Sequence, residues 1–331
     1  MLDSGPNGVT AMSKLYHHFG FKLRPTPPYN FGLTVRRPAG WSLFTPLEIY
    51  DGTTMWTTAN LEKNLLGIRL SSNEKVSDPE ISVTIFVAKE LTPVKKEKIK
   101  SLLVKALGTD QDLSEFYEFS NKDSILTHVI GDLYGMHDTF SIAIFPEALL
   151  AIMLQMAPLK RSNEMMNSFI ENYGDMAEFD GKKIKTWPSP EKIAGVPAED
   201  IASKCRAGYR AKFVVKMAKR LFAGDFPSAE QLHEIKEEEE AKEWLLELPG
   251  IGDYSADIIN PHGGFPIDVL SAEVFGKLLF GEKPENNRKE VEVVKREGQR
   301  RWGKWAWMAF LYVAQDLENL SRKLGINLRL T

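Results

Sequence analysis

Residues 248–268 read Leu-Pro-Gly-Ile-Gly-Asp-Tyr-Ser-Ala-Asp-Ile-Ile-Asn-Pro-His-Gly-Gly-Phe-Pro-Ile-Asp. The first part predicts a tight turn at Gly250 and Gly252 that opens a helix. A Gly-x-Gly turn in front of a helix leaves backbone N–H groups pointing outward, where they bind phosphate. The second part is a glycine-rich loop that ends in a single acid, Asp268, set among apolar residues. A backbone phosphate-binding turn followed by a lone carboxylate indicates chemistry on DNA.

The bulk composition is that of an ordinary globular chain. It has 331 residues, of which 43% are hydrophobic and 26% charged, enough for two or three domains with their own cores. No apolar run approaches the roughly 18 residues of a membrane span, and the N-terminus lacks a signal-peptide pattern. These observations predict an intracellular protein, in the cytoplasm or nucleoid (the nucleus if the source is a eukaryote), without a membrane partner.

Cysteine and histidine usage argues against a metal centre. The chain holds one cysteine, Cys205, which excludes disulfides within the chain and any cluster that needs four thiolates. The six histidines and the acidic residues show no spacing typical of a zinc site. We therefore expect no metal and no redox cofactor.

The charge is unevenly distributed. A net charge of −3 argues mildly against nucleic-acid binding by the chain as a whole, because phosphate binding requires lysine and arginine. However, residues 204–220 contain seven basic residues and no acid, whereas residues 234–247 are strongly acidic. This segregation indicates either one basic, DNA-facing surface or simply two solvated helix surfaces. The charge pattern alone favours neither interpretation.

The pattern along the chain predicts an α+β fold. Short Thr-, Val- and Ile-rich segments at 53–60, 65–70 and 81–87 indicate an N-terminal antiparallel β-sheet, on which a helix at 95–107 packs. Helices dominate from about residue 120 onward. We expect them at 145–156, 163–173, 190–195, 198–205, 208–223, 228–236, 238–247 and 269–280, followed by a charged stretch and a last long helix from about residue 305.

Three segments follow from this pattern. Residues 1–18 are expected to be a flexible N-terminal segment. Residues 19–118 form the antiparallel sheet domain with its packed helix. Residues 119–331 form mostly helical domains, with the active-site cleft between them.

The segment Leu248-Pro249-Gly250-Ile251-Gly252 joins two predicted helices, which matches a helix-hairpin-helix element. Such elements also serve as plain DNA-binding modules. The hairpin therefore predicts DNA contact at Gly250, Ile251 and Gly252 without implying catalysis.

Asp268 has a structural and a functional interpretation. It is well placed to be the N-cap of the helix predicted at 269–280, accepting backbone N–H bonds. A carboxylate at a helix N-terminus is also favoured in its ionised form, ready to stabilise a developing cation. The two roles are compatible with each other.

The hairpin together with Pro266-Ile267-Asp268 resembles the helix-hairpin-helix (HhH-GPD) superfamily of DNA base-excision glycosylases, whose signature is this hairpin, a Gly/Pro-rich loop and a catalytic aspartate. The resemblance covers about residues 22–320. Segments similar to 3-methyladenine DNA glycosylase II are Pro28-Tyr29-Asn30-Phe31, Leu154-Gln155-Met156 and Arg301-Trp302-Gly303-Lys304-Trp305. Segments similar to 8-oxoguanine DNA glycosylase are Gly208-Tyr209-Arg210-Ala211-Lys212-Phe213 and Phe265-Pro266-Ile267-Asp268-Val269. Both families place an antiparallel sheet before the helices.

The resemblance assigns DNA contacts outside the hairpin. It implies that Gln155 and Met156 contact DNA, with Met156 as an apolar wedge that fills the gap left by a flipped base. The alternative is an ordinary buried helix end. Tyr209, Arg210 and Lys212 are expected to bind backbone phosphates.

The resemblance also assigns a base pocket. Tyr254, Trp305 and Trp302 are expected to line it, because a π-rich face attracts a cationic base. The alternative is that the tryptophans are core residues. The only cofactor implied is a possible monovalent cation at the hairpin carbonyls.

Two departures from the superfamily pattern matter. Members that also cleave the strand carry a Schiff-base lysine two positions after the second hairpin glycine, where this chain has Tyr254. Without an amine there is no covalent imine route, so AP-lyase activity is not expected. In addition, the stretch between hairpin and Asp268 is about one helical turn shorter, and Pro261 is expected to end the helix early.

The sequence thus predicts a monofunctional DNA glycosylase of base excision repair, acting as a monomer on double-stranded DNA. It would flip a damaged base and hydrolyse its N-glycosidic bond, with Asp268 as the catalytic acid residue. An alkylated purine is the first choice of substrate, because a positively charged base is a good leaving group. The alternatives are an 8-oxoguanine DNA glycosylase and a non-catalytic helix-hairpin-helix DNA-binding protein, for which Asp268 would be dispensable.

Overall fold

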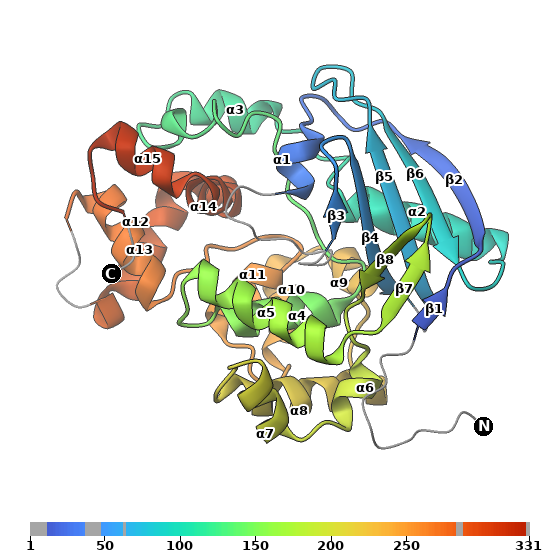
Figure 1. Ribbon diagram of the computed structural model, residues 1–331. Coiled ribbons are helices and arrows are strands. Elements are labelled where there is room, and N and C mark those ends of the chain that lie inside the picture. Colours follow the sequence, from blue (N-terminus) through green and yellow to red (C-terminus); the bar gives the residue numbers. More distant parts are fainter. Residues whose placement is uncertain (1–11, 37–47, 62–63, 283–286, 329–331) are drawn as a thin grey trace.

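A computed structural model describes residues 12–36, 48–61, 64–282 and 287–328. Figure 1 shows a sheet-rich part on the right and a helical part on the left and below, with the chain passing between them more than once. This agrees with the predicted α+β fold. No helix in the described part of the chain is long and apolar enough to cross a membrane.

The N-terminal part is built on a five-stranded sheet. Its strands are β2 (His17–Leu23), β3 (Ile49–Tyr50), β4 (Thr54–Leu61), β5 (Asn64–Ser72) and β6 (Ile81–Val87), in the order β2-β6-β5-β4-β3, and every neighbouring pair is antiparallel. Helix α2 (Pro93–Ala106) begins after the N-cap Thr92 and packs its buried face on the sheet core. The short α1 (Phe31–Val35) packs against the same core. The antiparallel sheet and its helix are confirmed.

A second, three-stranded sheet was not predicted. Strand β1 (Met12–Lys14) pairs in parallel with β7 (Met176–Phe179), which pairs with β8 (Lys182–Lys185). The β7–β8 turn carries Asp180, whose carboxylate accepts hydrogen bonds from Trp56 Nε1 at 2.7 Å and Arg69 Nη1 at 3.0 Å. This hairpin, within the range predicted as helical, therefore ties the helical part to the large sheet.

The N-terminal boundary also differs from the prediction. Residues 12–14 form β1 and β2 begins at His17, inside the range 1–18 that was expected to be flexible. The rest of that range, residues 1–11, lies outside the described residues.

The helical part follows the predicted order closely. Its helices are α3 (Ser114–Ser120), α4 (Ile144–Leu154), α5 (Leu159–Tyr173), α6 (Pro190–Ala194), α7 (Ala198–Lys204), α8 (Arg210–Ala223), α9 (Ala229–Glu234), α10 (Glu238–Leu246), α11 (Asp253–Ile259), α12 (Val269–Phe280), α13 (Asn287–Trp302), α14 (Ala306–Gln315) and α15 (Leu317–Leu324). Short 3-10 turns occur at Leu126–His128 and Gly303–Trp305.

The C-terminal helices depart from the prediction in two places. The charged stretch is helix α13, and the expected long last helix is divided at Asp316 into α14 and α15. Helix α13 buries a narrow stripe that includes Val294, Gly298 and Trp302 at spacings of four. Such a stripe, with glycine at one position, gives a weak apolar pattern in a charged sequence.

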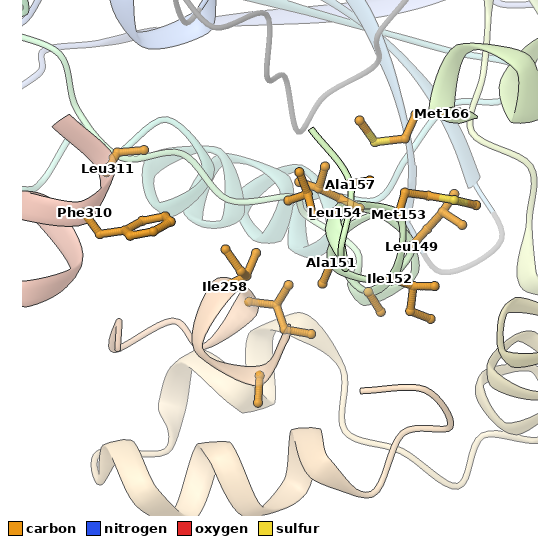
Figure 2. Packing of buried hydrophobic residues seen from close by; sticks show 14 of the residues in the cluster. Leu149, Ala151, Ile152, Met153, Leu154, Ala157, Met166, Ile258, Phe310 and Leu311 are labelled. Atoms are coloured by element: carbon orange, nitrogen blue, oxygen red, sulfur yellow. The ribbon is translucent and has the colours of Figure 1, made fainter. Parts of the chain in front are cut away.

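Helix α4 lies at the centre of the helical core. All of its residues are buried, and Figure 2 shows Leu149, Ile152, Met153 and Leu154 packed in the cluster. Residues of α3 belong to this core, whereas residues up to Leu107 belong to the sheet core. The C-terminal end of α4 enters the site described next.

Candidate functional site

The glycine turn predicted at residues 248–252 joins α10 to α11, as expected for a helix-hairpin-helix element. Gly250 has φ +89°, and a Cβ at this position would lie 2.5 Å from Cβ of Phe213 on α8. Glycine is therefore required here both for the backbone conformation and for close packing. Ile251 is buried in the core, while Gly252 is exposed and faces open space. The turn is anchored on its inner side and accessible on its outer side.

Four charged groups that the sequence analysis did not identify hold α11 in place. The Nζ of Lys242 on α10 lies 2.5 Å from Asp253 Oδ1 and 2.7 Å from Asp257 Oδ1. Lys295 of α13 forms ion pairs with the same two carboxylates. Burial opposes the charged form of Lys242, but its hydrogen bonds to both aspartates outweigh this and raise its pKa. The hairpin helix is thus fixed relative to α10 and α13. No spacing in the sequence signals this network.

The segment after α4 forms a strained turn. Ala157 N donates to Leu154 O at 3.3 Å, Gln155 has φ −53° and ψ 123°, and Met156 has φ +47°. These values describe a type II turn, whose third position favours glycine. Met156 occupies this position with 49% of its surface exposed. A strained backbone that carries an exposed apolar side chain is typical of a functional site.

Gln155 and Arg210, both predicted to contact DNA, are turned inward. Gln155 Nε2 donates to Gly250 O at 2.6 Å and to Ser255 Oγ at 2.9 Å, which links the Met156 turn to the hairpin. The Arg210 guanidinium donates to the carbonyl of Gln155, and Arg210 is only 5% exposed. Burial lowers the pKa of Arg210.

These side-chain donors contact the protein itself, and contact with DNA stays a prediction for both residues. Tyr209 and Lys212, by contrast, are exposed. The sequence alone did not separate the two kinds of side chain, because polar residues near an element end occur in both roles.

A pocket of about 90 Å³ lies beside the hairpin and the Met156 turn. Its floor comes from Tyr254 and Ile258 of α11 and from the start of α12, and Leu154 closes one side. The opposite wall comes from α14 and α15. Figure 2 shows Phe310 of α14 extending toward Ile258, with Leu154 beyond it. The polar side chains among the described lining residues are Tyr254, Asp268 and Ser271, and the others are apolar.

Asp268 is the N-cap of α12, as predicted, and it is half-buried in this pocket. Its Oδ1 accepts hydrogen bonds from the N–H of Leu270 at 3.0 Å, from the N–H of Ser271 at 2.8 Å and from Ser271 Oγ at 2.9 Å. In the described part of the chain no hydrogen bond reaches Oδ2. One oxygen of the carboxylate is held by the helix, and the other is available to a ligand.

Tyr254 lies in the same pocket. Burial, together with the charge of Asp268, raises the pKa of its hydroxyl, so the phenol stays protonated at neutral pH. A neutral phenol beside a carboxylate offers a donor and an aromatic face. The structure thus brings Tyr254 and Asp268 together as predicted.

The two tryptophans predicted for the pocket lie elsewhere. Trp302 is 1% exposed, with its ring centroid 5.4 Å from that of Phe265 in the core. The ring centroid of Trp305 lies 5.5 Å from that of Phe116. Neither belongs to the described pocket lining. Trp302 is a core residue, and Trp305 is partly buried outside the described pocket lining.

The wall that takes the place of the tryptophans was missed. It consists of Phe310, Val313 and Ala314 of α14 and Leu317 of α15. In the sequence these residues follow the same apolar spacing as ordinary core positions. No signal distinguishes a pocket wall from a core in such a segment.

The segment from the hairpin to Asp268 is short, and its path is tight. Helix α11 ends at Ile259, just before Pro261, as predicted. Gly263 and Gly264 have φ +91° and +159°, and a Cβ on either would lie 2.8 Å from Cβ of Trp307 or of Asp257, respectively. The two glycines let the chain pass between these side chains and deliver Asp268 to the pocket.

The hairpin carbonyls, at which the resemblance implies a monovalent cation, accept hydrogen bonds from the protein. Leu248 O accepts the N–H of Ile251 at 3.0 Å, and Gly250 O accepts the amide of Gln155. Each of these two oxygens already accepts one hydrogen bond from the protein. Among the described residues no group of three or more histidine, cysteine or acidic side chains is placed to hold a metal ion.

No protein-family model matches the chain. Its sequence is 25% identical to the DNA-3-methyladenine glycosylase of Bacillus subtilis over 224 residues, which cover 66% of this chain and 72% of that protein. Its fold is similar to a 3-methyladenine DNA glycosylase from Archaeoglobus fulgidus, with a TM-score of 0.66 at 20% identity over 90% of this chain and 99% of that one.

A third similarity is to the 8-oxoguanine glycosylase/lyase of Clostridium acetobutylicum, with a TM-score of 0.58 at 18% identity over 82% of this chain and 99% of that one. At sequence identities this low, the similarity to the two solved structures establishes a shared fold. The hairpin and the capping aspartate are the features from which the sequence predicted a DNA glycosylase, and these similarities are to proteins named as DNA glycosylases. These sequence relatives and structural neighbours of the chain are named as DNA glycosylases.

Proposed function

We propose that this protein is a DNA glycosylase that releases a damaged base from duplex DNA by hydrolysis. The observation that carries the proposal is the carboxylate of Asp268. It stands in an apolar pocket, has one oxygen without a hydrogen-bond partner among the described residues, and lies beside a glycine hairpin and an exposed apolar turn. The names of the sequence and fold relatives support the same activity.

Each element has a role in this reaction. The exposed backbone N–H groups at Gly252 and the start of α11 hold a backbone phosphate of the damaged strand. Met156 enters the stack and fills the space that the flipped base leaves. Tyr209 and Lys212, both exposed on α8 or at its N-cap, add contacts to the backbone.

The chemical step takes place at the mouth of the pocket. The bond between the sugar C1′ and the base nitrogen breaks, and its electron pair leaves with the base. The carboxylate of Asp268 stabilises the oxocarbenium-like sugar by electrostatic attraction. Water then adds to C1′ and loses a proton to solvent, which leaves an abasic site.

The substrate we propose is an alkylated purine. A base that carries a positive charge is already a good leaving group and needs no proton from the protein. The pocket suits such a base, since its lining is mostly apolar and includes the aromatic rings of Tyr254 and Phe310. A neutral oxidised base such as 8-oxoguanine requires more hydrogen-bonding groups for selection, and few are present in the described lining.

We further propose that the enzyme does not cleave the strand. Tyr254 occupies the position of the Schiff-base lysine of the bifunctional members, and no lysine belongs to the pocket lining that the structure describes. Without an amine at the sugar there is no imine and no β-elimination through it. The product is an intact strand with an abasic site.

The test is a panel of duplexes, each with one damaged base. Wild-type protein and Asp268→Asn are incubated with each duplex, and hot alkali then reveals abasic sites. We expect release of N3- or N7-alkylated purines by the wild type, with at least a hundredfold loss in the variant. Breaks that appear without alkali, or an adduct trapped by borohydride, would refute the single-function assignment.

The rival function is DNA binding without catalysis. It predicts that the wild-type protein binds every duplex of the panel and releases no base from any of them. Activity of Asp268→Asn within a few-fold of wild type would remove Asp268 from the catalytic role. Release of 8-oxoguanine alone would refute the alkylated-purine proposal and leave the glycosylase activity intact.

A further inference from the structure

The capping box at the start of α12 has an unusual third residue. In most capping boxes the residue three positions after the N-cap is Glu or Gln, which reaches back to the N-cap N–H. Here that residue is Ser271, and its short side chain brings the hydroxyl against both the backbone and the carboxylate of Asp268. Ser271 also lines the pocket.

The hydrogen bonds determine where the Ser271 proton points. Asp268 N donates to Ser271 Oγ at 2.7 Å, so the hydroxyl oxygen acts there as an acceptor. Its single proton then has two candidate acceptors, Asp268 Oδ1 at 2.9 Å and the Asp268 carbonyl oxygen at 3.3 Å. The shorter distance and the negative charge of the carboxylate favour Oδ1.

Three donors therefore converge on one carboxylate oxygen. Two are backbone N–H groups of the first turn, which any residue except proline would supply. The third depends on the side chain of Ser271. Together they fix the rotation of the carboxylate, so that Oδ1 faces the helix and Oδ2 is left for the pocket.

We propose that Ser271 is a positioning residue for Asp268, a role that rests on the proposed glycosylase function. It holds the carboxylate in one rotation and places Oδ2 where the sugar cation develops. Because Oδ1 is occupied by three donors, Asp268 acts through its charge. Loss of the Ser271 hydroxyl lets the carboxylate turn and weakens this placement, while the carboxylate itself and the hairpin stay in place.

A purely structural role is the competing explanation, since a capping box also stabilises its helix. The chain offers a matched control in α9, where Ser228 is the N-cap and its backbone N–H donates to Gln231 Oε1 at 2.9 Å. Gln231→Ala removes the reciprocal bond of a capping box outside the pocket. It reports what loss of such a bond does to stability alone.

The experiment compares four variants on a duplex that the wild-type protein cleaves. Ser271→Ala removes the hydroxyl. Ser271→Thr and Ser271→Val are nearly equal in shape, and only the first keeps a hydroxyl. Gln231→Ala is the control. Single-turnover rate, duplex Kd and Tm are measured for each protein.

We expect Ser271→Ala and Ser271→Val to lose about tenfold or more in single-turnover rate, as for one hydrogen bond to a charged group. Their duplex Kd should stay within about twofold of wild type. Ser271→Thr should be at least fivefold faster than Ser271→Val. Gln231→Ala should lower Tm as much as Ser271→Ala does and keep the wild-type rate.

Equal rates for Ser271→Thr and Ser271→Val would overturn the proposal, because the hydroxyl would then have no role of its own. A wild-type rate in Ser271→Ala would overturn it as well. Failure of the proposed function is recognised separately, since Asp268→Asn would then retain activity whatever the Ser271 variants do.

Discussion

Gln155 and Gly250 are 95 positions apart in the chain, and the side-chain amide of the first donates to the carbonyl of the second at 2.6 Å. This bond joins the turn that carries Met156 to the glycine hairpin. Arg210 adds a bond to the Gln155 carbonyl from a third element, α8. These bonds fix the position of the Met156 turn relative to the glycine hairpin. Binding of a DNA phosphate at the hairpin therefore also positions the proposed wedge.

The first prediction concerns this coupling. Gln155→Leu keeps the volume of the side chain and removes both donor bonds, leaving the carbonyl of Gly250 without its partner. We expect base flipping, followed by 2-aminopurine fluorescence next to the lesion, to fall by about tenfold, as for loss of a buried hydrogen bond. Binding to an undamaged duplex should change by less than twofold. An unchanged fluorescence signal would show that the Gln155 bond does not position the wedge.

The second prediction separates the strain at Met156 from its function. Met156→Gly relieves a left-handed backbone, worth of order 1–3 kcal/mol, at a chain-entropy cost of about 0.5–1 kcal/mol. The free energy of unfolding should therefore stay level or rise by up to about 2.5 kcal/mol, while base release falls. Urea denaturation measures the change in stability, and single-turnover kinetics measure the change in base release.

Met156→Ala, which loses the side chain and keeps the strained backbone, is the control. Lower stability in Met156→Gly would mean that the methionine packs rather than intercalates.

The sequence predicted the parts of this site that depend on local chemistry. The hairpin was recognisable because few residues other than glycine suit Gly250, and the N-cap role of Asp268 followed from a carboxylate in front of an apolar helix. Strands β4, β5 and β6 were placed within two residues of their ends because their β-branched runs are bounded by turn residues.

The parts that the sequence did not predict depend on tertiary packing. The wall residue Val313 and the core residue Leu311 are both apolar positions of one helix, and the packing of neighbouring helices decides which of them meets the pocket. Arg210 has the sequence context of an exposed helix start, yet the turn at Gln155 covers it. The Asp253–Lys295 pair joins elements that no short-range pattern connects.

The third prediction concerns pH and stability. Glu147 is buried on α4, and desolvation, opposed by the N–H of Ser141 and reinforced by the charge of Asp138, raises its pKa from 4.5 to about 8. The folded state therefore keeps a proton that the unfolded chain releases between about pH 4.5 and 8. Stability from this group is complete below pH 4.5 and is lost as the pH rises toward 8.

Glu147→Gln tests this linkage, because the amide keeps an acceptor for Ser141 and does not ionise. The variant should lose less free energy of unfolding than the wild type between pH 5 and 8, and its relative stability should be greatest near pH 8. Urea denaturation at several pH values gives the comparison. Parallel curves for the two proteins would show that Glu147 does not titrate in this range.

The fourth prediction separates Lys212 from Arg210 in DNA binding. If about four phosphates are neutralised, the slope of log K against log salt should be roughly −3 to −4, despite the net negative charge of the chain. Lys212→Ala removes an exposed cation and should make the slope less negative by up to about 1. Arg210→Ala should leave the slope unchanged, because its guanidinium is buried against Gln155, and should instead slow base release.

The matched control is Lys183→Ala, which removes an exposed lysine of β8 and should change neither the salt slope nor the rate of base release. A slope altered equally by Lys183→Ala and Lys212→Ala would show that the start of α8 does not face the DNA. A slope altered by Arg210→Ala would show that this side chain turns outward when DNA binds.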